Sequence, residues 1–348
     1  MDTERTDLIQ RHLKILEGLQ YESGLFAASK KGMGEGYDKA WLRDNFYECL
    51  AFEAFDDFDT VQRTYRAILD IFKKHEYKID YAVEKKPEHT HQYIHARYHP
   101  ETFDEYWEEW GNKQNDSVGC ILYKLGQLEE LKSGFIIQDD DDRRVVQKLV
   151  KYLETLEYWH DADSGMWEEN QEIHASSIGA CVAGLHMTKH IAGVTVPDGL
   201  IEKGRDALSK LLPQESESKL VDLALLSLIW PYAVTSAEET ALILHNSELE
   251  LVRERGVIRY TGDRYFDTHS NGTVGEAEWT FGLSWLAIIY AKLGNRKKAR
   301  EYLERAKSVV TADGLPELYF ANSRDYNENT PLGWSESLFI VALREIDR

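Results

Sequence analysis

The chain has 348 residues, a formal net charge of −20 at pH 7 and 43% apolar residues. This apolar fraction is enough for a packed core, and a closed toroid or barrel of this length can form around a single core, so we expect one globular domain over residues 1–348. The negative charge disfavours nucleic acid, anionic membranes and polyanionic substrates as partners, which leaves a neutral ligand as the expected one.

Helical periodicity dominates the chain, while the alternating pattern of strands is scarce. For example, Val61, Tyr65, Leu69 and Phe72 fall on one helical stripe. About twelve helices are expected from such stripes and from start signals, with ends good to about 2–4 residues. They cover residues 4–19, 38–55, 58–75, 116–131, 140–159, 174–191, 197–213, 219–231, 235–252, 276–293, 295–310 and 332–346.

The lengths of the links indicate how these helices pair. Short links join the fifth to the ninth helix, which favours antiparallel hairpins, and longer stretches precede even-numbered helices at residues 20–37, 76–115, 253–275 and 311–331. Six such hairpins can close into a ring with one inner and one outer helix each. We therefore predict an all-α fold, an (α/α)6 toroid, with the long loops forming a mouth at one end.

Four motifs lie just before even-numbered helices, or in their first turn, and so share one end of the predicted ring. Backbone N–H groups and the positive end of the helix dipole favour hydrogen-bond acceptors there. Each motif alone is also compatible with an ordinary helix cap, but their matching positions indicate a common site. The motifs are AWLRDN (40–45), WGNKQND (110–116), GMWEEN (165–170) and GLPELY (314–319).

Two carboxyl groups in these motifs, Glu168 and Glu317, suit the cleavage of a glycosidic bond. That reaction needs one protonated carboxyl for the leaving oxygen and one ionised carboxyl that activates water or attacks carbon. Their helices lie on opposite sides of a six-hairpin ring, which would suit the separation of roughly 6.5–9.5 Å of an inverting mechanism. Repulsion from the adjacent Glu169 could raise the pKa of Glu168. Two solvated acids at helix starts are the alternative interpretation.

WLRD, WGNKQND, WEEN and PELY occur in an order and approximate spacing that resemble the glucoamylase family, glycoside hydrolase family 15, over nearly the whole chain. The helical domain that phosphorylase kinase regulatory subunits share with that family is also similar, particularly at AWLRDN, HARYHPETF (95–103) and AEWTF (277–281). The resemblance implies no cofactor and no catalytic metal. Four histidines cluster in the long loop before the fourth predicted helix, namely His89, His91, His95 and His99. Accordingly, we expect no metal site there.

The resemblance also implies a role for each matching residue. Glu168 matches the general acid and Glu317 the general base. Arg43 and Asp44 match residues that bind hydroxyls of the terminal glucose, although a buried pair between the two is the alternative. The other implied substrate contacts are Trp110 near the scissile bond, Glu169 at the adjacent sugar, Arg264 with Tyr265 as an Arg-Tyr pair, and Trp279.

Two departures from the family pattern limit what can be transferred. The chain has no room for the extra β-domain or starch-binding module of many relatives, so granular starch is not expected as a substrate. Ala277-Glu278-Trp279 replaces the usual Asn-Pro-Trp, so preferences for linkage and chain length do not carry over. Glu278 would reshape subsites or cap a helix.

The sequence thus predicts an inverting, exo-acting α-glucosidase of the glucoamylase type, which releases glucose from soluble α-glucan oligosaccharides or a related α-glucoside such as trehalose. A catalytically silent carbohydrate-binding or regulatory domain is the alternative from another class, and the presence of both Glu168 and Glu317 favours the enzyme. A third hypothesis is an (α/α)6 glycosidase for a different sugar, such as a disaccharide or a uronic-acid-containing glycan, whose carboxylate Arg264, Lys113 and His95 would bind.

The compartment is predicted from the cysteines and the N-terminal sequence. Cys49, Cys120 and Cys181 are widely spaced and odd in number, which favours neither a zinc site nor a disulfide framework. MDTERTDLIQ lacks the basic and apolar regions of a signal peptide, and no run of about 18 apolar residues occurs. We expect a cytoplasmic protein that binds an oligosaccharide and neither nucleic acid nor membrane; the oligomeric state is not predicted.

Overall fold

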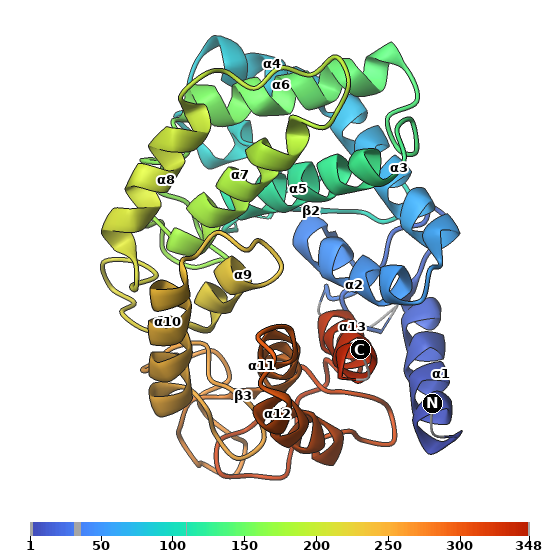
Figure 1. Ribbon diagram of the computed structural model, residues 1–348, viewed down its shortest axis with the longest axis vertical. Helices are drawn as coiled ribbons and strands as arrows, with labels where there is room; N and C mark the ends of the chain where they lie inside the picture. The colour runs from blue at the N-terminus through green and yellow to red at the C-terminus, as the bar shows by residue number, and fades with distance from the viewer. Residues whose placement is uncertain (1–2, 31–35, 109, 347–348) are drawn as a thin grey trace.

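The computed structural model describes residues 3–30, 36–108 and 110–346, and its helices form a closed ring (Figure 1). Within these residues six helices make the inner layer. Each packs against the next, and the last packs against the first. The predicted all-α toroid is therefore confirmed. The inner helices are α2 (Leu42–Ala54), α5 (Asn115–Leu131), α7 (Ala175–Thr188), α9 (Leu226–Ile229), α11 (Phe281–Lys292) and α13 (Gly333–Glu345).

The outer helices lie against this ring, and each packs on an inner helix. Burial separates the layers: every residue of Phe281–Ala291 in α11 is buried, whereas α12 buries only Ala299, Tyr302, Leu303 and Ala306. A helix that is apolar all round belongs in a core, and one with a single stripe belongs at the surface. The outer helices are α1 (Thr3–Leu19), α3 (Phe58–Lys74), α6 (Asp140–Leu156), α8 (Leu200–Leu211), α10 (Ala237–Glu250) and α12 (Arg296–Ser308).

The inner helices correspond to the even-numbered helices of the prediction, but several bounds differ. The second and tenth start later than expected, because strand β1 (Ala40–Trp41) and strand β3 (Glu278–Trp279) precede α2 and α11. The eighth is reduced to the 3-10 turn η2 (Leu223–Leu225) and α9, since Asp222 caps the start through Ala224 N and Pro231 follows the end.

Helix α4 (Glu76–Glu84) was not predicted. It lies where a long loop was expected, and packs on α6. Its nine residues bury only Lys78, Ile79 and Ala82, which is too short a pattern to be recognised as a stripe. The rest of this connection holds the 3-10 turn η1 (Thr90–Gln92) and strand β2 (Arg97–Tyr98).

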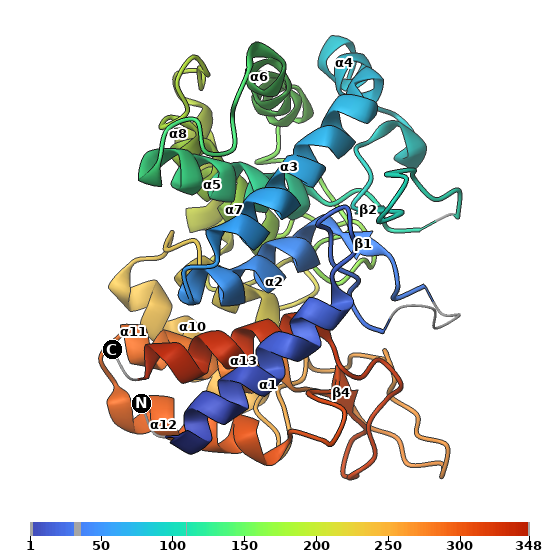
Figure 2. The same cartoon turned by 90° about the vertical axis from the view of Figure 1, so that its right-hand side faces the viewer.

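Two short ladders fix the long loops against the starts of inner helices. Strand β2 pairs antiparallel with β1, and β4 (Leu318–Tyr319) pairs antiparallel with β3. The strands and the long loops gather at one end of the ring, on the right of Figure 2. The backbone hydrogen bonds of these ladders position the motif residues at the mouth.

Buried side chains from Ile9 to Ile346 form one contiguous hydrophobic cluster. No helix among the described residues is both long and apolar enough to span a bilayer. The assignment of residues 1–348 to one domain stays a prediction.

Candidate active site

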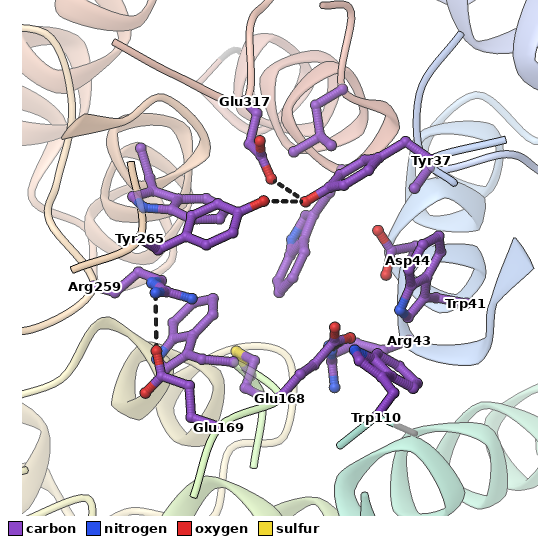
Figure 3. Close-up of a pocket in the computed structure, with 16 residues that line it drawn as sticks. Tyr37, Trp41, Arg43, Asp44, Trp110, Glu168, Glu169, Arg259, Tyr265 and Glu317 are labelled. Atoms are coloured by element: carbon purple, nitrogen blue, oxygen red, sulfur yellow. Dashed lines mark hydrogen bonds and ion pairs between the residues drawn. The ribbon is translucent and has the colours of Figure 1, made fainter. Parts of the chain in front are cut away.

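A cavity of about 260 Å³ lies among the starts of the inner helices, close to the lower end of the range of about 300–1,000 Å³ for small-molecule pockets. Most of the predicted site residues line it (Figure 3). The structure thus brings together side chains that are far apart in the sequence. The predicted residues in the lining are Arg43, Asp44, Trp110, Glu168, Glu169, Tyr265, Trp279 and Glu317.

Glu168 lies in a tight turn with the left-handed φ of 64°, which is uncommon for a residue with a side chain. Such strain persists only where neighbours hold the backbone, and it is frequent at functional sites. Glu169 N bonds to Ser164 O at 3.0 Å, and Ser164 N bonds to Lys113 O at 2.8 Å. A Cβ on Gly111 would lie 2.7 Å from Glu168 O, so the WGNKQND segment needs its glycine to pack on this turn.

The pKa of Glu168 is raised to about 7, chiefly by burial and further by Asp44. Arg43 opposes this, with its Nη2 3.3 Å from Glu168 Oε1. Glu169, which was expected to raise this pKa, is not among the main causes of the shift, and two positive side chains balance its charge. Arg259 Nη2 lies 2.9 Å and Lys219 Nζ 2.6 Å from its carboxylate oxygens. Burial would raise the pKa of Glu169, but these two cations outweigh it and lower the pKa.

Glu317 is 1% exposed, comes just before β4 and accepts hydrogen bonds at both oxygens. Tyr37 OH donates to Oε1 at 2.7 Å, and the side-chain amides of Asn327 and Asn329 donate to Oε2. Burial raises the pKa of Glu317, and these three donors counteract it because they stabilise the ionised form. Glu317 and Glu168 face each other across the pocket (Figure 3).

Arg43 is held by the WGNKQND segment. Its Nη1 donates to Gln114 Oε1 and to Asp116 Oδ2, both at 2.9 Å. The alternative of a buried ion pair between Arg43 and Asp44 does not occur. Asp44 has no hydrogen bond from another side chain in the described part of the chain, and burial raises its pKa to about 6 although the charge of Arg43 counteracts this rise. Its oxygens are therefore available to a ligand in the pocket.

The Trp110 ring forms one wall of the pocket, between two side chains of the HARYHPETF segment. His95 stacks on it with ring centroids 5.6 Å apart, and the Arg97 guanidinium lies 4.1 Å from its centroid. Burial lowers the pKa of His95 to about 3, so the imidazole is neutral. Lys113 Nζ is 2.9 Å from Asp161. Because neither His95 nor Lys113 lines the pocket, neither supports binding of a sugar carboxylate.

On the opposite wall of the pocket, one predicted residue is wrong. Arg264 is exposed and does not line the pocket, whereas Arg259 is 4% exposed and does. Asp263, four residues after Arg259, accepts from its Nε at 2.7 Å and turns the guanidinium inward. Arg259 thus takes the place predicted for Arg264 beside Tyr265 in the lining, while Tyr260 OH donates to Glu169 Oε2 at 2.8 Å from outside it. In the sequence, the acid Asp263 four residues after Arg259 is the signal that distinguishes Arg259 from Arg264.

Tyr37 and Trp41 are among the other lining residues that were not predicted. Trp41 is part of AWLRDN, but Tyr37 lies in an irregular loop with no pattern that marks it. Glu278 does not line the pocket and instead accepts a hydrogen bond from Arg255 N at 2.6 Å. The described residues contain no group of three or more His, Cys, Asp or Glu side chains placed to hold a metal ion.

Comparisons with known proteins show the family and the fold of the chain. The sequence model of the family described as glycosyl hydrolases family 15 matches residues 3–343. The skeletal-muscle phosphorylase b kinase regulatory subunit alpha of Oryctolagus cuniculus is 25% identical, in an alignment that covers 88% of this chain and 30% of that protein. The chain therefore spans about a third of the length of the curated relatives it matches.

Solved structures show the same fold. A glycosidase variant in complex with glucose has a TM-score of 0.82 at 18% identity, covering 100% of this chain and 99% of that chain. A bacterial glucoamylase complexed with acarbose has a TM-score of 0.76 at 14% identity, covering 98% of this chain and 55% of that chain. At these identities the likeness concerns the fold alone.

Proposed function

The chain belongs to family 15 of the glycosyl hydrolases, as its motifs had indicated, and on this basis we propose that it is an inverting α-glucosidase that releases glucose from the ends of soluble α-glucosides. The observation that carries the proposal is the pair of facing carboxyl groups in unlike environments. Burial raises the pKa of Glu168 to about 7, whereas three hydrogen-bond donors limit the rise that burial causes in the pKa of Glu317. One acid and one base are what an inverting mechanism needs.

In the proposed reaction Glu168 gives its proton to the glycosidic oxygen as the bond to the anomeric carbon breaks. Glu317 takes a proton from a water molecule that attacks the same carbon from the opposite face, so the released glucose is the β-anomer. Tyr37 fixes the base through the 2.7 Å hydrogen bond to Glu317. No cofactor or metal is required for these proton transfers.

The terminal glucose is proposed to lie between these carboxyl groups. Asp44 accepts from its hydroxyls, and the Arg43 guanidinium, fixed by Asp116, lies beside the leaving oxygen near Glu168. Trp110 and Trp279 add aromatic surface to the pocket around the sugar. Arg259 and Glu169 lie on the other wall, where the next sugar of the substrate would bind.

The second candidate is a catalytically silent, sugar-binding regulatory domain. It is favoured by the curated relatives, which are named as regulatory subunits of phosphorylase b kinase. A silent domain has no need for a strained turn that presents a carboxyl group with a raised pKa, or for three donors around a second carboxyl group. These features favour the enzyme.

The test is glucose release from maltose, maltotriose, isomaltose and trehalose, with the product anomer followed by NMR. Glu168→Gln and Glu317→Gln are each expected to lower kcat at least about 100-fold, while Glu172→Gln, in the same segment but outside the pocket, should not. α-Glucosyl fluoride separates the roles, because fluoride leaves without a proton donor. Glu168→Gln should still cleave it and Glu317→Gln should not.

Release of α-glucose as the first product would contradict inversion. Full activity of either variant would contradict the assigned acid or base. If no substrate turns over, while maltotriose binds saturably to wild type and to both variants, the regulatory candidate is supported instead.

A further inference from the structure

His12 of α1 and Glu336 of α13 form a hydrogen-bonded pair that is completely buried and lies outside the pocket. Both residues are 0% exposed, and His12 Nδ1 contacts Glu336 Oε2. The His12 ring is held at its edge by Phe339, with centroids 4.8 Å apart. Burying two ionisable side chains costs stability unless they are well paired, and an apolar pair would serve packing alone at least as well. The position of the pair therefore needs another explanation.

The second oxygen of Glu336 connects the pair to the loop of the proposed general base. Glu336 Oε1 accepts from Leu315 N at 2.6 Å, two residues before Glu317. The preceding Gly314 has a φ of 116°, and a Cβ there would lie 2.3 Å from Glu336 Oε1. The glycine lets the backbone approach the carboxylate, and the carboxylate sets where the backbone lies.

Other hydrogen bonds continue this support up to Glu317. Thr280 Oγ1 and Ser335 Oγ both donate to Pro316 O, and Thr280 N donates to Glu317 O at 3.2 Å. Helix α1 also holds the beginning of the same loop, because Arg11 Nη2 donates to the carbonyl oxygens of residues 311 and 312, each at 2.8 Å. The segment from 311 to 317 is thus fixed between α1, α11 and α13.

We infer that the His12–Glu336 pair positions the general base, so that the first outer helix contributes to the reaction without touching substrate. The inference rests on the proposed role of Glu317. His12 holds Glu336 in the orientation that bonds Leu315 N. Since a displacement of about 1 Å in a reacting group can cost about 100-fold in rate, this orientation matters to the base. Arg43, which is proposed to bind glucose, is held by Gln114 and Asp116 of another segment.

The experiment compares His12→Ala with Leu16→Ala at a temperature where both variants are folded. Leu16 is one turn further along α1 and equally buried, but makes no hydrogen bond to the base loop. For His12→Ala, kcat should fall about 10- to 100-fold with KM within about threefold of wild type. The loss should be equal for maltose and α-glucosyl fluoride, because both need the base to activate water. Leu16→Ala should change kcat less than about twofold.

Two more variants keep the inference testable. His12→Asn places an amide donor close to the position of imidazole Nδ1, and should restore part of kcat. Glu336→Gln retains an oxygen for Leu315 N and replaces His12→Ala in the experiment if His12→Ala does not fold. It should lower kcat less than about tenfold. Equal losses in His12→Ala and Leu16→Ala would reduce the pair to a packing role. A loss confined to maltose would show that it acts on the acid.

Hydrogen–deuterium exchange separates this inference from the proposed function. In His12→Ala, amide exchange should rise in peptides from residues 311–318 and stay unchanged in residues 163–172, which carry Glu168. This holds even if the wild type hydrolyses nothing, in which case the proposed function fails alone. Unchanged exchange at 311–318, or an equal rise in both segments, overturns the positioning role.

Discussion

Arg43 Nη2 lies 3.3 Å from Glu168 Oε1, yet the carboxyl group keeps a pKa of about 7. A guanidinium this close normally lowers the pKa of an acid. Here burial outweighs Arg43, and the negative charge of Asp44 adds to the effect of burial. Arg43 also forms an ion pair with Asp116, which weakens its effect on Glu168. A substantial fraction of Glu168 is therefore protonated at neutral pH, as its proposed role as the acid requires.

The first prediction concerns the pH profile. A general acid must be protonated to act, so kcat/KM for maltose should fall as the pH rises through about 7, the pKa of Glu168. A general base must be ionised, so kcat/KM should also fall at low pH as Glu317 becomes protonated. The measurement is kcat/KM for maltose from pH 4 to pH 9.

α-Glucosyl fluoride provides the control for this profile, because its fluoride ion leaves without a proton from Glu168. Its alkaline limb should flatten while its acid limb stays, because Glu317 is still needed. An alkaline limb of equal steepness for the two substrates would contradict the assignment of Glu168 as the acid.

The second prediction is that Tyr37→Phe raises the pKa of the base. The Tyr37 hydrogen bond to Glu317 favours the ionised carboxylate, and its loss makes the proton harder to remove. The acid limb of kcat/KM should therefore move to higher pH, which narrows the profile. Tyr265→Phe is the matched control, because Tyr265 OH bonds to Tyr37 at 2.8 Å and not to Glu317. An unmoved acid limb in Tyr37→Phe, or an equal shift in both variants, would refute this role.

The third prediction compares two arginines five residues apart. Arg259→Ala leaves the buried Asp263 carboxylate and the partly buried Glu169 without their guanidinium, so unfolding free energy should fall by about 3–5 kcal/mol, and kcat/KM should fall with it. Arg264→Ala removes an exposed side chain outside the pocket and should leave both quantities unchanged. Urea denaturation and maltose kinetics measure them. A loss of activity in Arg264→Ala would restore the Arg-Tyr pair first predicted from the sequence.

The inner helices and the two acids in the loops that precede them could be predicted because both depend on local sequence. An apolar stripe or a continuous apolar run marks a helix wherever it lies, and the long loops before even-numbered helices place Glu168 and Glu317 at one end of the ring. Trp279 shows where this reasoning fails. Its pairing in β3 with Leu318 delays the start of α11, and such two-residue ladders leave no periodic signal.

Contacts between distant segments could not be predicted from one sequence. Glu169 was expected to raise the pKa of Glu168 because the two are adjacent, but Lys219 and Arg259, distant in the chain, neutralise it. Tyr37 donates a hydrogen bond to Glu317 although the two residues are 280 positions apart in the sequence. Electrostatic effects depend on separation in space and on burial, and neither can be read from the order of residues.

The last prediction concerns Glu48, a carboxyl group of α2 that points at α13. It is 0% exposed, a Cβ on Gly333 would lie 1.9 Å from its Oε1, and neither oxygen has a hydrogen-bond partner among the residues described. Burial, followed by the charge of Asp44, raises the pKa of Glu48 well above its ordinary value. Because the folded state holds this proton more tightly than the unfolded chain, the stability it provides is complete below about pH 4.5 and is lost as the pH rises towards the folded pKa.

Glu48→Gln should therefore gain stability relative to wild type between pH 4 and pH 8, since its neutral amide keeps the shape and removes the titration. Urea denaturation at the two pH values measures this gain. Glu53→Gln on the same helix is the control: Glu53 is paired with Lys124 at 2.7 Å, so its replacement should not stabilise the protein at pH 8. If the difference between Glu48→Gln and wild type is the same at both pH values, Glu48 titrates in its ordinary range and must have a partner.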